Sequence, residues 1–130
     1  MPIYTHITVG TNDLDKARAF YDKVLAPLGL KRLMDRDTGS FYGAEGPEFM
    51  VLKPRDGQPA TKANGLTIGF RAPSKEAIDE FYKTALELGG TDEGEPGFRD
   101  FVPNLYAAYV RPGRPQGPGQ LRLAGIINQS

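Results

Sequence analysis

The chain has 130 residues, 39% of them hydrophobic, which is enough for one domain with its own buried core. Its 16 basic and 16 acidic side chains give a formal net charge of zero, so composition gives no reason to expect nucleic acid or a membrane as a partner. The chain has no cysteine, which excludes disulfides, thiolate metal sites and cysteine nucleophiles.

The first predicted element is a strand over residues 3–11, where apolar and polar residues alternate. Ile7 and Val9 share one face of this strand and are suited to pack beneath a helix. The opposite face carries Tyr4, His6 and Thr8. The two faces are therefore expected to meet different surroundings, the first a core and the second a cavity.

A helix is expected next, with Asn12 or Asp13 as its N-terminal cap. Its apolar stripe runs over residues 14–28, and Pro27 and Gly29 stop it. Three short strand candidates, separated by turn-forming residues, follow the helix. They are residues 31–36, 40–44 and 49–53.

Residues 66–90 repeat residues 5–29 without a gap, as a strand, a capped helix and a glycine stop. The aligned pairs are Ile7 with Ile68, Phe20 with Phe81, Tyr21 with Tyr82, Leu25 with Leu86 and Gly29 with Gly90. The second helix has Ser74 as its cap. After it we expect a short strand near residues 91–93, a loop rich in glycine and acidic residues, a strand at 105–111 and a weaker strand at 120–127 that pairs at the sheet edge.

The repeat predicts an α+β fold of two βαβββ modules, residues 1–54 and 65–130, joined by the loop 55–64 in a single domain. We expect the eight strands to form a curved mixed β-sheet with the helices on its outer face. The inner face then lines a cavity that suits a small molecule. The opening strands contribute Tyr4, His6, Thr8, Thr67, Gly69 and Arg71 to that face.

Three motifs in the chain are similar to those of a known family: HITVGTNDLDKARAFYDKVLAPLGLKRL, APSKEAIDEFYKTALELGG and PNLYAAYV. They resemble the vicinal oxygen chelate superfamily, which includes glyoxalases, extradiol dioxygenases, fosfomycin-resistance enzymes and bleomycin-binding proteins. The similarity covers roughly residues 2–111. It implies the fold described above and a homodimer, but it does not imply a reaction, because this fold hosts unrelated functions.

In metal-dependent members of this family, His or carboxylate side chains from the opening and closing strands of each half hold a divalent ion. His6 matches the first ligand position, whereas Thr67 stands at the second. The other two positions are matched by Val51 or Met50, and by Leu123 or a neighbour, none of them a useful ligand. A catalytic ion generally needs three protein ligands, so we expect no cofactor and interpret His6 as a possible relic ligand. The alternatives are weak metal binding by His6 with Glu48 and a site shared between protomers.

The candidate ligand-binding residues are His6, Tyr42, Thr67, Arg71 and Tyr106. Some have a simpler explanation, because His and Tyr often pack in a core and Arg71 can be a solvated charge at a strand end. Tyr106 and Tyr109 cannot share a face of a regular strand, so at most one of them is expected in the cavity. Arg99, next to Phe98 and before Phe101, is a candidate for a lid over it.

The tail after Arg111 departs from the family. Members commonly close the last hairpin with Asp-Pro-Asp-Gly, whereas residues 112–119 are PGRPQGPG, a composition that predicts an irregular loop. Codons for the family motif can yield Pro-Gly-Arg in a shifted reading frame. One hypothesis is therefore a frame change in the gene after Arg111, which the coding DNA would test.

We expect a cytoplasmic protein that binds a small, partly apolar molecule in the cavity without a complete catalytic metal site. The first residues lack the pattern of a signal peptide, and no apolar stretch approaches the length of a membrane span. One alternative is a divalent-metal-dependent lyase, isomerase or dioxygenase of the glyoxalase type. A second alternative is a degenerate fold kept for protein association.

Overall fold

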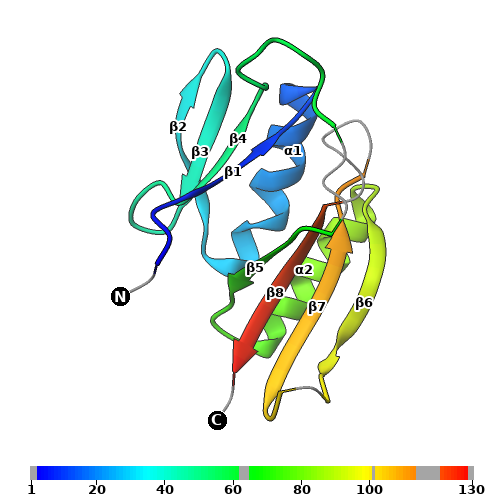
Figure 1. Cartoon of the computed structure of the whole chain (residues 1–130). Helices are drawn as coiled ribbons and strands as arrows, with labels where there is room; N and C mark the ends of the chain where they lie inside the picture. Colours follow the sequence, from blue (N-terminus) through cyan, green and yellow to red (C-terminus); the bar gives the residue numbers. More distant parts are fainter. Residues whose placement is uncertain (1–2, 62–64, 101, 114–120, 129–130) are drawn as a thin grey trace.

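The protein folds as two βαβββ modules that follow one another along the chain (Figure 1). The structure, a computed structural model, describes residues 3–61, 65–100, 102–113 and 121–128. The first module contains β1 (Ile7–Gly10), α1 (Leu14–Val24), the 3₁₀ turn η1 (Ala26–Leu28), β2 (Lys31–Arg36), β3 (Gly39–Gly43) and β4 (Phe49–Leu52). The second contains β5 (Thr67–Arg71), α2 (Lys75–Glu87), β6 (Thr91–Phe98), β7 (Leu105–Arg111) and β8 (Arg122–Asn128).

Each module builds a four-stranded sheet with the same strand order, β1-β4-β3-β2 in the first and β5-β8-β7-β6 in the second. In both sheets the opening strand pairs in parallel with the closing strand, and the other pairings are antiparallel. The predicted α+β class with two βαβββ modules is confirmed. Within the described residues the strands form two open sheets and not one continuous sheet.

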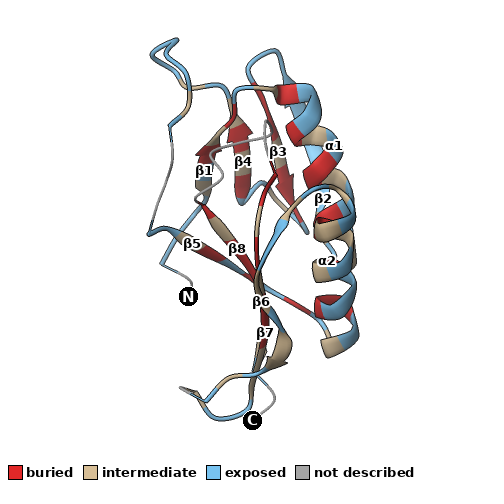
Figure 2. Cartoon of the chain, turned by 90° about the vertical axis from the view of Figure 1, so that its right-hand side faces the viewer, coloured by how far each residue is buried: buried red, intermediate tan, exposed pale blue. Residues whose placement is uncertain are grey.

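The two helices lie along one side of the molecule and turn their buried residues towards the sheets (Figure 2). The predicted caps form: Asp13 Oδ1 accepts the Lys16 N–H at 3.1 Å, and Ser74 Oγ accepts the Ala77 N–H at 3.1 Å. α1 ends at Val24, earlier than its apolar stripe suggests, because the chain tightens into η1 at Pro27 and turns at Gly29 with φ +83°.

We call the face of each sheet that turns away from the helices its open face. In β5, Ile68 and Phe70 are buried, whereas Gly69 and Arg71 on the open face are exposed, as the alternation predicts. The rings of Phe49 on β4 and Phe70 on β5 meet edge to face, with centroids 5.2 Å apart. This contact joins the core of the first module to that of the second.

Two strands of the second module differ from the prediction. β6 is a strand over Thr91–Phe98, where we expected a short strand and then a loop. Its pairing with β7 is irregular at two places, and as the edge strand it tolerates glycine and proline within its length. β8 is not an edge strand but lies between β5 and β7, so its alternating residues face the core and the open side.

Parts of two predictions fall outside the described residues. These are the end of the loop 55–64 and residues 114–120, on which the hypothesis of a frame change partly depends. That hypothesis and the division into modules 1–54 and 65–130 stay predictions. In the described part of the chain, neither helix has the length and apolar character needed to cross a membrane.

Candidate ligand site on the open face of the second sheet

The open face of the second sheet carries a hollow of about 520 Å³. Thr67 on β5 is paired with Arg122 on β8, and Tyr109 on β7 is paired with Ala124 two residues further along β8. Directly paired strand residues point to the same face, so Thr67, Tyr109 and Arg122 lie together. The alternate position Gly125 faces Ile78 and Phe81 of α2 instead. The hollow therefore opens on the side away from the helix.

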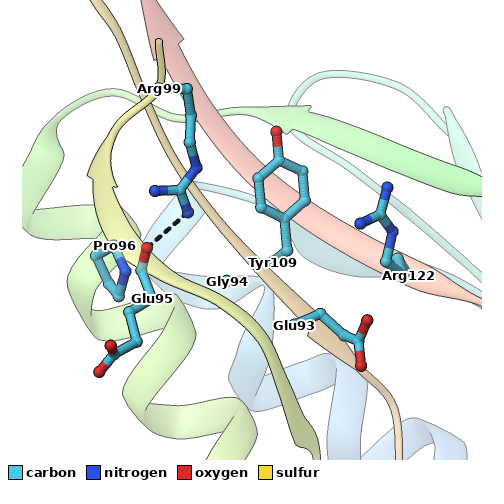
Figure 3. Close-up of a pocket in the computed structure, with 7 residues that line it drawn as sticks. All are labelled: Glu93, Gly94, Glu95, Pro96, Arg99, Tyr109 and Arg122. Carbon is cyan, nitrogen blue, oxygen red and sulfur yellow. Dashed lines mark hydrogen bonds between the residues drawn. The ribbon is translucent and has the colours of Figure 1, made fainter. Parts of the chain in front are cut away.

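The centre of the hollow is an aromatic ring between two cations. The Arg99 Cζ lies 5.3 Å from the centroid of the Tyr109 ring, and the Arg122 Cζ lies 5.2 Å from it. Figure 3 shows Tyr109 standing between these two arginines, with β6 passing beside it. Both distances are within the range of a cation–π interaction. We call these three residues the Arg-Tyr-Arg cluster.

Each guanidinium of the cluster is held by a neutral partner. Arg99 Nη2 donates to the backbone oxygen of Glu95 at 2.6 Å, and Arg122 Nε donates to Thr67 Oγ1 at 2.9 Å (Figure 3 shows the first of these). In the described chain, neither guanidinium has a carboxylate within ion-pairing distance. By contrast, Glu93, which also lines the hollow, is paired with Arg111 at 3.0 Å. The cluster therefore carries two positive charges without an acidic partner.

Gly94 lets β6 lie against the cluster. A Cβ atom at this position would be 2.9 Å from Tyr109 Cδ2 and 3.1 Å from Arg99 Nη2, closer than side chains normally approach. Any other residue would therefore push the ring or the guanidinium out of place. Gly94, which the sequence analysis assigned to a loop, thus allows the backbone of β6 to lie close to Tyr109 and Arg99 in the wall of the hollow.

A second hollow, of about 650 Å³, lies where the two modules meet, and His6 and Arg71 both line it. His6 stands just before β1, is exposed, and its Nδ1 lies 3.0 Å from Thr5 Oγ1. Thr67 instead supports Arg122 at the first hollow. The structure therefore separates residues that the sequence assigned to one cavity, since His6 and Arg71 line this hollow, Thr8 lines another, and Thr67 lies beside the first.

The two candidate tyrosines, Tyr42 and Tyr106, lie on the helix side of their sheets. The Tyr42 hydroxyl donates to Asp22 Oδ1 at 2.9 Å, and the Tyr106 hydroxyl donates to Asp79 Oδ1 at 2.7 Å. Tyr42 forms part of the wall of the second hollow but is fully buried, and burial together with its hydrogen bond to Asp22 raises its pKa. The hydrogen bond to Asp79, with burial, raises the pKa of Tyr106 to about 12. Both hydroxyls therefore join a helix to a sheet and face away from the hollow of the second sheet.

The positions at which the sequence resemblance implies metal ligands do not fit a divalent ion here. His6 is the first of them, but the Thr67 hydroxyl is engaged by Arg122, and Leu123 is fully buried on the helix side. At the remaining position, Val51 is buried, and the Met50 sulfur lies 3.9 Å from the Thr8 hydroxyl. The described residues contain no group of three or more His, Asp or Glu side chains arranged to hold a metal.

Sequence reasoning missed Arg122, weighed Tyr109 against Tyr106 and selected Tyr106, and named Arg99 only as part of a lid. One weak signal was present: Arg111, the one charged residue of its strand, shares a face with Tyr109, whereas Val110 shares a face with Tyr106. Arg122 alternates with the apolar Leu121 and Leu123 in the same way. Nothing in the sequence shows that Arg99 and Arg122 approach the same ring, because that depends on the pairing of three strands.

Known proteins share both the sequence pattern and the fold. The family model described as Glyoxalase/Bleomycin resistance protein/Dioxygenase superfamily matches residues 3–111. A glyoxalase/bleomycin resistance protein from Albidiferax ferrireducens T118 is 36% identical, with 96% of this chain and 98% of that chain covered and a TM-score of 0.82.

A glyoxalase/bleomycin resistance protein/dioxygenase family enzyme from Burkholderia phytofirmans PsJN is 15% identical, with coverage of 94% and 95% and a TM-score of 0.66. A glyoxalase-related enzyme from Fulvimarina pelagi is 14% identical, with coverage of 96% and 88% and a TM-score of 0.67. These two likenesses concern the fold alone. No curated protein matches. The family model and the 36% identity show that the chain belongs to the glyoxalase/bleomycin resistance protein/dioxygenase superfamily.

Proposed function

We propose that the protein binds a small molecule in the hollow on the open face of the second sheet, without a complete catalytic metal site. The observation that carries the proposal is the Arg-Tyr-Arg cluster, whose ring and two guanidiniums converge on a hollow of about 520 Å³. Ligand pockets are typically of this size and contain a few convergent polar groups. The half-buried state of Arg99, Tyr109 and Arg122 leaves part of each side chain for a ligand.

The alternative, a metal-dependent lyase, isomerase or dioxygenase of the glyoxalase type, has weaker support. Its best donors, His6 and Glu48, line the second hollow and not the first. Two donors of this kind bind a divalent ion only weakly. Elemental analysis of protein purified without a chelator separates the two functions, since stoichiometric nickel, zinc, manganese or iron would contradict binding without a metal.

Ligand binding is tested by a thermal-shift screen of small organic molecules against the wild-type chain and the Tyr109→Ala variant. A compound present at 100 times its dissociation constant should stabilise the folded wild type by about 2.7 kcal/mol. We expect the variant to lose this response, whereas Tyr106→Phe, on the opposite face of β7, should keep it. Compounds that stabilise wild type and Tyr109→Ala equally would place binding elsewhere and contradict the proposal.

We also propose that the chain forms a homodimer, as its family resemblance implies. Static light scattering at micromolar concentration measures the mass directly, and a value near the 14.2 kDa of one chain would contradict the dimer.

A further inference from the structure

We propose that the ligand of the Arg-Tyr-Arg cluster is a small organic oxyanion, a carboxylate or a phosphonate, whose charged group is held by Arg99 and Arg122. This inference rests on the proposed function and names the chemical class of its ligand. Three observations support it: the balance of charge in the hollow, the hydrogen-bonding capacity of the guanidiniums and the rigidity with which they are held.

The two arginines of the cluster are not paired with the two glutamates that also line the hollow, Glu93 and Glu95. Glu93 is engaged by Arg111 at 3.0 Å, so this pair contributes no net charge. Glu95 meets Arg99 through its backbone oxygen, and Figure 3 shows its carboxylate directed away from the Arg99 guanidinium. Arg99 and Arg122 thus face the hollow with two guanidiniums that no carboxylate among the described residues approaches within ion-pairing distance. A bound anion would supply the missing negative charge.

The guanidiniums also retain donors for a ligand. A guanidinium has five N–H groups, and the described structure engages one nitrogen of each, Nη2 of Arg99 and Nε of Arg122. The remaining donors form the planar fork that matches two oxygens of a carboxylate or a phosphonate. A neutral ligand would use at most some of these donors and would leave the charge uncompensated.

The cluster is held in place before any ligand arrives. Each arginine is fixed by one hydrogen bond and by contact with the Tyr109 ring, and Gly94 brings β6 against both Tyr109 and Arg99. Side chains fixed in this way lose little conformational freedom on binding, which favours affinity. The first sheet has no comparable site in its described residues, since Arg36 alone lies over Phe41, at 5.8 Å.

The test compares matched probes that differ in charge: phenylacetate and phenylphosphonate against neutral phenylacetamide. Binding is followed by two-dimensional NMR of the labelled wild-type chain, using the backbone signals of Gly94 and Tyr109. We expect both acids to bind at least about tenfold more tightly than the amide, the size of effect that a charge-assisted hydrogen bond produces. The advantage of the acids should shrink as salt is added.

Variants then assign the effect to the two arginines. The double variant Arg99→Gln with Arg122→Gln should remove the preference for acids, whereas Arg36→Gln, the same change at a cation–π arginine of the first sheet, should keep it. Thermal unfolding checks that each variant is folded. If the double variant is not folded, the comparison of acids with the amide on wild-type protein still decides.

The outcomes separate this inference from the proposed function. If the amide shifts the Gly94 and Tyr109 signals with the same affinity as the acids, the hollow binds a ligand but the oxyanion inference is wrong. If none of the three probes moves these signals, the oxyanion inference is wrong, and the proposed function then depends on the thermal-shift screen with Tyr109→Ala. If the double variant still binds the acids more tightly than the amide, Arg99 and Arg122 do not hold the charged group and the inference is wrong.

Discussion

The two modules have the same strand order but very different open faces. That of the first sheet is apolar around Phe41, which is paired with Met50 and with Met34 and has Arg36 over its ring. That of the second sheet places Tyr109 between two arginines above a hollow. The helix-facing sides are alike in composition, because both must fill a core. Repetition of a fold thus constrains the buried side and leaves the open side free to differ.

The helix-facing sides share even a polar detail. In each module a strand tyrosine donates a hydrogen bond to a helix aspartate, Tyr42 to Asp22 and Tyr106 to Asp79. The two pairs differ in burial, since Tyr42 is fully buried and Tyr106 is only partly so. The same hydrogen bond therefore occurs in two different surroundings within one chain.

The largest effect is expected where the two cores meet. Phe49→Ala should lower the free energy of unfolding by about 3–5 kcal/mol, because Phe49 is 3% exposed and its ring contacts Tyr21, Tyr42 and Phe70. Phe41→Ala on the open face of the same sheet should cost only about 1 kcal/mol. Urea denaturation measures both. Equal losses would mean that the open face of the first sheet is as tightly packed as the core.

A side chain at Gly94 should disturb the second open face. Gly94→Ala places a methyl group against Tyr109 and Arg99, and such overpacking costs about 1–3 kcal/mol. Gly46→Ala is the matched control, since a Cβ there has no neighbour within 4 Å, and its effect should stay within about 0.5 kcal/mol. Thermal unfolding of both variants tests this, and a neutral Gly94→Ala would show that the cluster has room to move.

Removal of the two hydroxyls should reveal their unequal burial. Tyr42→Phe leaves Asp22 with its ion pair to Arg32 but removes the hydrogen bond from the buried hydroxyl. The free energy of unfolding should fall by about 1–3 kcal/mol. Tyr106→Phe removes the more exposed hydrogen bond to Asp79 and should lower the free energy of unfolding by about 0.5–1.5 kcal/mol. Chemical denaturation at pH 7 gives both values. A larger loss for Tyr106→Phe would contradict the order of burial.

The smallest effect concerns alkaline pH. Because the pKa of Tyr106 is raised to about 12 in the folded chain, its neutral form is favoured there more than in the unfolded chain. The stabilisation by its hydrogen bond should be fully present below the ordinary tyrosine pKa of about 10 and should be lost as pH rises towards 12. The difference in unfolding free energy between wild type and Tyr106→Phe should therefore shrink over this window. A difference that does not change with pH would contradict a raised pKa.

The sequence was sufficient for the fold because its signals are local and repeated. Caps at Asp13 and Ser74, the glycine stop after each helix and the alternation in β1 and β5 depend on near neighbours along the chain. β6 was harder, since Gly94 and Pro96 are typical of a loop and are tolerated only because that strand lies at an edge.

The candidate site could not be predicted in the same way. Thr67 and Arg71 are on the face that alternation predicts and His6 stands just before β1, but which hollow each one joins depends on how the two sheets lie in space. Tyr106 was selected in place of Tyr109 because the run from Leu105 to Arg111 is mostly apolar on both faces and gives little sign of its orientation. Whether the selected residues bind a ligand stays a prediction.

The interior position of β8 has a consequence for how the chain folds during synthesis. The first sheet has all its strands once residue 52 has left the ribosome, so this half can fold early. The second sheet must wait for residues 122–128, the last strand to emerge. Both β5 and β7 pair with β8, so neither has its native neighbour on that side until β8 is made. Until then, two strand edges stay open to wrong partners, and a nascent chain stalled in this interval is where aggregation should begin.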